Sequence, residues 1–184
     1  MKAILLPALL LFVLSTISRS QTCREVVRDA SGRVVQTIER QKQAGSTERA
    51  VIRDASGRVI GTATTQVSAG GGGQTTFRDA HGRATGSATT QGSSSGSFRT
   101  TYRDANGRTT GSATSNNFSG SGSRTQYRDA SGRLTGNQTT TNVSPSGSFS
   151  GTRRDASGRL VSSSSGNGKC QGAARAPMPT SGVR

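Results

Sequence analysis

Arg28-Asp29-Ala30-Ser31-Gly32-Arg33 is the stretch of sequence that decides the fold, because the chain contains six copies of it. The spacing between copies is 25 residues four times and then 26, and only the Ser position varies, to His or Asn. Self-similarity at a fixed period indicates an array of like structural units. The copies begin at Arg28, Arg53, Arg78, Arg103, Arg128 and Arg154.

Each copy of the motif predicts a tight turn. The Asp carboxylate can accept a hydrogen bond from a backbone N–H two residues later. The next two residues fit the centre of a type I turn, and Gly supplies the positive φ that follows such a turn in a bulged hairpin. The predicted turn residues are Asp29, Gly32, Asp54, Gly57, Asp79, Gly82, Asp104, Gly107, Asp129, Gly132, Asp155 and Gly158.

The residues between the motifs predict two strands per repeat. A Thr-rich segment follows each motif, then a Gly/Ser tip such as residues 92–96, then a second extended stretch. Threonine and aromatic residues favour strands, and Gly/Ser clusters favour turns. The simplest register sets Arg28 opposite Val34 and Val27 opposite Val35. It likewise sets Phe77, Tyr102 and Tyr127 opposite Thr85, Thr110 and Thr135.

These features predict an all-β array of six 25-residue hairpin units, meander or solenoid-like, with low-complexity Gly/Ser/Thr tips. Glycine recurs inside a strand eight residues after the leading Arg, which indicates close approach of another backbone. These glycines are Gly61, Gly86, Gly111 and Gly136. The outer copies have Gln36 and Ser162 there, as expected of capping units at the ends of an array.

A largely disordered chain is the alternative fold. From Gln21 onward, Leu, Ile, Val and Phe make up 19 of 164 residues. This is below the roughly 20% under which a highly charged chain is expected to be disordered. In that case the product would be a secreted peptide reservoir or effector.

The first twenty residues predict export. Met1-Lys2 is cationic, residues 3–17 are leucine-rich, and Ser18-Arg19-Ser20 places small residues before a cut at Gln21. The domain prediction is a signal peptide (1–20), a repeat region (21–161) and a C-terminal tail (162–184). An uncleaved anchor is the alternative, and no later apolar stretch is long enough to cross a membrane. The expected location is secreted, periplasmic or at the cell surface.

The two cysteines, Cys23 and Cys170, predict one disulfide in an exported chain. Free or intermolecular thiols are the alternative. Twelve strands at ~4.8 Å would form a flat sheet roughly 50 Å wide, so an internal bridge requires the array to curl or the tail to fold back. No His or further Cys lies nearby at metal-ligand spacing, so no metal or cofactor is expected.

The fifth copy with its flanks, Tyr127-Arg128-Asp129-Ala130-Ser131-Gly132-Arg133-Leu134-Thr135-Gly136, resembles the tyrosine-aspartate repeats of bacterial Rhs-type proteins. Those repeats have Tyr-Asp, two variable residues and Gly-Arg on consecutive β-hairpins. Here Arg stands directly before Asp, and the chain is far shorter than the shells that the family builds. The resemblance covers residues 24–162. It implies hairpin geometry and a bacterial surface or secretion setting, without the encapsulation of a toxin.

The charge is the main clue to function. The chain has 24 Lys+Arg against 9 Asp+Glu, and removal of the leader leaves 22 − 9 = +13. Rows of guanidinium groups can bind phosphate or sulfate, while arginines that only pair with their Asp neighbours and stay solvated are the alternative. The candidate polyanion-binding residues are Arg28, Arg53, Arg78, Arg103, Arg128 and Arg154.

No catalytic set can be assembled, since His81 is the only histidine and occupies a turn position. The first expectation is therefore an exported non-enzymatic protein with a structural or adhesive role at the cell envelope or outside the cell. The second is a secreted cationic binder of polyanions such as lipopolysaccharide, teichoic acid, glycosaminoglycan or extracellular nucleic acid. Tyr102 and Tyr127 are candidates for stacking on bases or sugars. No small-molecule substrate is expected.

Overall fold

The computed structural model describes residues 22–167 except 44, 94–95, 119–121 and 143–146. The predicted signal peptide, Cys170 and most of the predicted tail lie outside the described residues. The described chain forms twelve strands. They are β1 (Thr22–Asp29), β2 (Val34–Lys42), β3 (Thr47–Asp54), β4 (Val59–Val67), β5 (Gly73–Asp79), β6 (Ala84–Gly92), β7 (Ser97–Asp104), β8 (Thr109–Phe118), β9 (Gly122–Asp129), β10 (Leu134–Asn142), β11 (Phe149–Asp155) and β12 (Leu160–Asn167).

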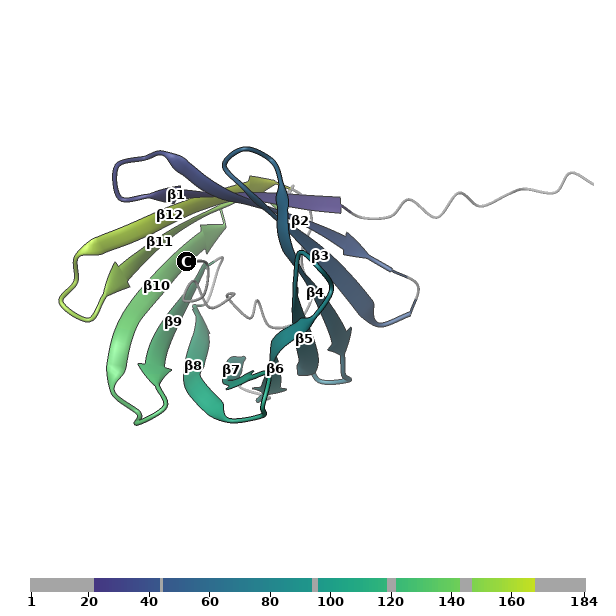
Figure 1. The fold of residues 1–184 in the computed structure, drawn as a ribbon. Helices are drawn as coiled ribbons and strands as arrows, with labels where there is room; N and C mark the ends of the chain where they lie inside the picture. Colours follow the sequence, from purple (N-terminus) through teal and green to yellow (C-terminus); the bar gives the residue numbers. More distant parts are fainter. Residues whose placement is uncertain (1–21, 44, 94–95, 119–121, 143–146, 168–184) are drawn as a thin grey trace, which may run out of the picture.

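The strands form one closed antiparallel barrel in which each strand pairs with its neighbours in sequence and β1 pairs with β12 (Figure 1). The prediction of an all-β fold built from hairpins is therefore confirmed. The solenoid-like alternative is wrong, and so is a largely disordered chain, since the strands run from Thr22 to Asn167. Within the described residues, no helix is long and apolar enough to cross a membrane.

The seam between β1 and β12 corrects the prediction of capping units. Val27 pairs with Ser164, and Asp29 pairs with Ser162, the residue that was expected to cap one end of the array. Strands twist relative to one another, so a sheet of twelve strands can curl until its two edges meet. Closure pairs both edge strands and removes the need for caps.

The hairpin register differs by one residue from the simplest pairing. Arg103 does lie opposite Thr109, but Tyr102 lies opposite Gly111 instead of Thr110, because the register shifts between these two pairs. A β-bulge of this kind adds one unpaired residue to one strand. The same shift occurs in all six hairpins. It places the residue before each motif directly opposite the recurrent glycine in the four central copies.

The recurrent glycines confirm the expected close approach of another backbone. A Cβ atom added to Gly61 would lie 2.7 Å from the carbonyl oxygen of Arg78 on the neighbouring strand. A Cβ on Gly86 or Gly111 would likewise press against a backbone carbonyl oxygen of the next strand. A backbone carbonyl cannot rotate away as a side chain can. Any residue other than glycine at these positions would therefore require the neighbouring strands to shift.

The core lines the inner face of the barrel, mainly along β2 to β9. Side chains alternate along each strand, as in β5, where Thr75 and Phe77 are buried while Gln74 and Arg78 are exposed. The outer face carries Thr, Ser, Gln and Arg. The buried apolar cluster comprises Ile38, Ala50, Ile52, Ala63, Phe77, Ala88, Tyr102, Ala113 and Tyr127.

Hydroxyl pairs between repeats satisfy four of the buried threonine side chains, those of Thr75, Thr90, Thr100 and Thr125. Thr90 and Thr100 are both buried, and their hydroxyls lie 2.9 Å apart on adjacent strands. Equivalent bonds join Thr65 to Thr75 at 2.8 Å and Ser115 to Thr125 at 2.7 Å. Buried polar groups destabilise a fold unless they are hydrogen-bonded, so these pairs let a barrel with few large apolar side chains remain closed.

Candidate functional site: an arginine rim at one end of the barrel

Every motif turn has the same backbone and carboxylate geometry. In the first copy, the Asp29 amide donates to the Arg33 carbonyl at 2.9 Å, and the Gly32 amide donates to the Asp29 carbonyl at 3.0 Å. The Asp29 carboxylate oxygen Oδ1 accepts from the backbone amides of Ser31 and Arg33, both at 2.9 Å. These four hydrogen bonds recur in all six turns. The predicted Asp residues thus open the turns, and the Gly residues follow three positions later with φ between 80° and 85°.

The hydrogen bonds hold five of the turn carboxylates in the charged state. The Ser56 hydroxyl, which donates to Asp54 at 2.7 Å, is the main cause that lowers the pKa of Asp54 to about 2. The pKa of Asp79 is also lowered, chiefly by the backbone amide of Arg83, since His81 has no hydroxyl in that position. The pKa is lowered in the same direction at Asp29, Asp129 and Asp155. These five carboxylates are therefore fixed negative charges, and each Oδ1 atom accepts two backbone hydrogen bonds.

The leading arginine of each motif is bonded to its own turn. In the fourth copy, the Arg103 Nη1 atom donates to the Gly107 carbonyl at 2.8 Å. Equivalent bonds of 2.8 to 3.1 Å join the leading arginine to the turn glycine in the other five copies. The six arginines predicted as polyanion contacts therefore also cap the turn, with part of each guanidinium fork already used.

The second arginine of each motif is the more available of the two. Its backbone amide holds the Asp carboxylate, while its side chain extends from the turn; Arg83, Arg108, Arg133 and Arg159 are all exposed. Arg58 is the exception among the described second arginines, because its Nε atom lies 3.1 Å from Asp54 Oδ2, yet its side chain is still 82% exposed. Sequence reasoning selected the leading arginines and overlooked these, although both positions recur with the same period.

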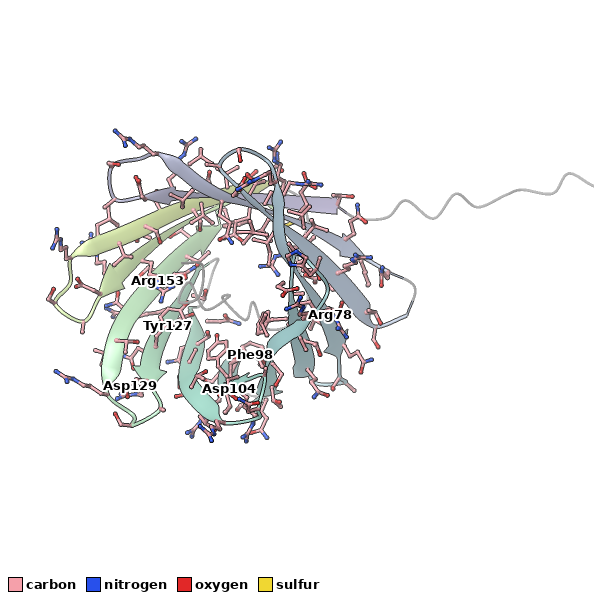
Figure 2. The ribbon with its side chains drawn as sticks, in the orientation of Figure 1. Arg78, Phe98, Asp104, Tyr127, Asp129 and Arg153 are labelled. Atoms are coloured by element: carbon pink, nitrogen blue, oxygen red, sulfur yellow. The ribbon has the colours of Figure 1, made fainter. Side chains whose placement is uncertain are left out.

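The barrel brings all six turns to one end. Odd-numbered strands run toward the motif and even-numbered strands run away from it, so the turns form a ring (Figure 1). Adjacent hairpins are two strands apart, which spaces neighbouring turns by about 10 Å. Figure 2 shows Asp104 and Asp129 near the ends of their hairpins. We call this ring the arginine rim, and it comprises residues 28–33, 53–58, 78–83, 103–108, 128–133 and 154–159.

The arginine rim has a net positive charge. It contains twelve arginines and six aspartates, which gives 12 − 6 = +6 without His81. Of the described glutamates, Glu39 lies 3.7 Å from the leading arginine Arg53, outside the turn itself. No group of three or more His, Cys, Asp or Glu side chains suited to a metal ion occurs among the described residues. The chemistry that the rim offers is therefore anion binding by guanidinium forks.

A second polar region lies inside the barrel, and the sequence reasoning did not predict it. Arg40 forms ion pairs with Glu25 at 3.7 Å and with Glu48 at 3.5 Å, and all three side chains are largely buried. The Arg153 guanidinium lies 4.7 Å from the centre of the Tyr127 ring, as Figure 2 illustrates. Arg153 occupies the position directly before the motif where Phe77 and Tyr127 stand in other copies, and this break in the repeat is the signal that was missed.

Burial of the tyrosines corrects the suggestion that they stack on bases or sugars. Tyr102 and Tyr127 are only 8% and 7% exposed on the inner face. Burial raises the pKa of both phenols. The Tyr127 hydroxyl donates to Gln138 at 2.9 Å, while the buried Tyr102 hydroxyl has no hydrogen-bond partner among the residues that the structure describes. Both rings act as core side chains.

The predicted disulfide is compatible with barrel closure. Cys23 is 2% exposed and is not a free thiol. Its neighbour Arg24 pairs with Asn167 across the seam, and Cys170 follows Asn167 by three residues, a reach of about 10 Å at most. The curling that an internal bridge requires is therefore present. Cys170 lies outside the described residues, so the bridge stays a prediction.

Comparison with known proteins adds no family. No protein-family model, no curated protein and no solved structure matches this chain.

Proposed function

We propose that this chain is an exported, non-enzymatic protein that adheres to polyanions at the cell envelope or outside the cell. The observation that carries the proposal is the arginine rim, where six copies of one turn place twelve arginines at a single end of a closed barrel. The adhesive role and the polyanion-binding role, which the sequence left as alternatives, become one activity in this proposal.

The chemistry of arginine supports an anionic partner. Guanidinium groups present planar forks that match phosphate and sulfate oxygens, and they remain charged at every physiological pH. Arginine outnumbers lysine by 21 to 3 in the chain. Lipopolysaccharide, teichoic acid, glycosaminoglycan and extracellular nucleic acid all carry such groups in regular arrays, and these are the proposed partners among envelope and extracellular components.

The barrel supports adhesion by fixing the arginines in place. The turns are held by five shared hydrogen bonds, four within the backbone and carboxylate and one from the leading arginine. A site that is already ordered loses less conformational entropy on binding than a flexible cationic tail would. The predicted leader sequence supports a location outside the cytoplasm, where these partners occur.

Heparin chromatography of the exported full chain tests the proposal. At about 0.15 M salt the protein should be retained, and it should elute as rising salt screens the charges. Replacement of Arg83, Arg108, Arg133 and Arg159 by Gln should lower the eluting salt concentration.

A matched control separates the arginine rim from general positive charge. Four exposed arginines on the outer face, Arg24, Arg49, Arg99 and Arg124, lie away from the motif turns. Their replacement by Gln removes the same number of charges and should lower the eluting salt less. Elution of the unchanged protein in the void volume would contradict polyanion adhesion, and equal effects of both variants would contradict the rim as its site.

A further inference from the structure

We infer that the arginine rim docks end-on against a flat, anionic phospholipid surface, with the second arginine of each motif making the contacts. This inference rests on the proposed function and specifies its partner. Three features of the described residues support it. They are the ring shape of the rim, the different bonding of the two arginines in each motif, and the side chains at the tips of the turns.

The ring of six turns fits a flat surface better than a linear polymer. The six turns end at the same end of one barrel, and about 10 Å separates neighbours. A flat layer of headgroups can meet all six turns at once. An extended polymer crossing the end of the barrel meets only the turns along its path, or else must bend around a tight circle. Simultaneous contact multiplies weak individual interactions into useful avidity.

The different bonding of the two arginines in each motif assigns the lipid contacts to the second arginine. Each leading arginine is tethered to a turn carbonyl, as for Arg128 and Gly132 at 2.8 Å. The second arginines extend from the turn. Within the described part of the chain, the side chains of Arg83, Arg108, Arg133 and Arg159 have no hydrogen bond or ion pair. These four second arginines therefore retain their full guanidinium forks for phosphate groups, whereas Arg58 is paired with Asp54.

The tips of the turns indicate peripheral contact without insertion. Between the Asp and the second arginine, each turn contains only Ala, Gly and one of Ser, His or Asn. No Trp, Phe or Leu is present there to enter the acyl region, unlike in helices that anchor by burying apolar side chains. Binding at this surface should therefore be electrostatic, reversible and sensitive to salt.

Vesicle flotation with the exported full chain tests the inference. The protein should float with phosphatidylcholine vesicles that contain phosphatidylglycerol, should remain unbound with phosphatidylcholine alone, and should dissociate when salt is raised. The variant in which Arg83, Arg108, Arg133 and Arg159 are Gln should bind the anionic vesicles about a thousandfold more weakly, the order expected from four arginines near an anionic leaflet.

The control is the variant in which Arg24, Arg49, Arg99 and Arg124 are Gln, which loses the same charge from the side of the barrel. Its vesicle affinity should stay within about threefold of the unchanged protein, because those groups lie far from an end-on contact relative to the Debye length. Circular dichroism melting of both variants checks that they fold. Arg58 is left in place because of its ion pair with Asp54.

Three outcomes would overturn the inference. Equal weakening by both variants would mean that no particular face meets the membrane. Retention on heparin without vesicle binding would assign the rim to a linear polyanion and leave the proposed function standing. Absence of binding to both heparin and vesicles would remove the proposed function as well.

Discussion

The motif turns and the connection at residues 68–72, at the opposite end of the barrel, share one backbone turn but differ in what the side chains add. At the end opposite the arginine rim, the Ser68 amide donates to the Gly72 carbonyl at 2.9 Å, and the Gly71 amide donates to the Ser68 carbonyl at 3.2 Å. This is the backbone pattern of the motif turns. Only at the rim does an Asp carboxylate add two further bonds to it, as from Ser56 and Arg58 to Asp54.

The difference shows that backbone hydrogen bonds reverse the chain at a turn, whereas the Asp and Arg side chains add the charge. The connections at the far end vary in sequence and are rich in Gly and Ser, whereas the motif turns are constant in length and nearly constant in sequence. Local hydrogen bonding alone suffices to reverse the chain at either end. At the rim, the additional Asp and its two arginines therefore form a charged surface as well as a turn.

The largest expected effect lies at the far end, where Cys23 directly precedes the first paired residue of the seam, Arg24. Replacement of both Cys23 and Cys170 by Ser should lower the free energy of unfolding by as much as about 5 kcal/mol, because the predicted bridge between them would close a long loop in the unfolded chain. Urea unfolding of the exported protein measures it. An unchanged midpoint of urea unfolding would contradict an internal disulfide next to the seam. So would a disulfide between two chains, found by non-reducing mass spectrometry.

The next effect concerns the wall just below the rim. Gly111→Val should lower the free energy of unfolding by about 3 kcal/mol, because its side chain would press on the backbone carbonyl of Arg128. Thr110→Val, at the neighbouring exposed bulge position, should change it by no more than about 0.5 kcal/mol. Thermal and urea unfolding compare the two variants. Similar effects at both positions would show that the backbones do not approach here.

The acidic end of the pH range should weaken the rim turns selectively. The hydrogen bond from the Ser56 hydroxyl lowers the pKa of Asp54 in the folded protein from its ordinary value of 3.8 to about 2. A lowered pKa contributes stability that is present above the unfolded pKa and is lost as pH falls toward the folded value. The melting temperature should be steady near neutral pH and fall by several degrees between about pH 4 and 2.

Asp54→Asn is the matched variant for this titration, because it keeps the shape of the side chain and removes its charge. It should melt lower than the unchanged protein at neutral pH, and the difference should shrink as pH approaches 2. Melting curves by circular dichroism at a series of pH values provide the measurement. Parallel curves for the two proteins over the whole range would rule out a contribution from this carboxylate.

The smallest effect should come from lengthening a far-end connection. Two glycines inserted after Gly70 should cost no more than about 0.6 kcal/mol, since loop-closure entropy grows slowly with length. The same insertion between Ala105 and Asn106 should cost several times more, because it separates Asp104 from the amides that it accepts from. Equal costs at the two ends would remove the distinction between them.

Local features of the fold could be predicted from the sequence, whereas its closure could not. The Asp and Gly of each motif determine the turn through contacts between residues at most four positions apart. The recurrent glycines within the strands indicate the close approach of a neighbouring backbone. The seam joins residues such as Val27 and Ser164, which lie far apart in the chain and share no pattern. Closure depends on the accumulated twist of twelve strands, and neither Gln36 nor Ser162 signals it.

The register and the site illustrate the same limit. Val34 and Val35 are both apolar, so alternation did not reveal which of them bulges out, whereas the structure pairs Arg28 with Val34 and Val27 with Gln36. The repeated arginines could be identified as a charged feature of the fold. Which arginine of each pair is tethered depends on the reach of its side chain to the turn glycine, and the sequence does not encode that reach in any pattern.

The pairing of β1 with β12 is the central structural claim, and NMR of the isotope-labelled exported protein tests it most directly. We expect nuclear Overhauser effects between backbone protons of Val27 and Ser164 and between those of Arg28 and Ser163, alongside the contacts within each hairpin. Hairpin contacts without any β1–β12 contacts would establish an open sheet and contradict the barrel. Amide resonances clustered at random-coil positions would contradict the fold, and with it the arginine rim.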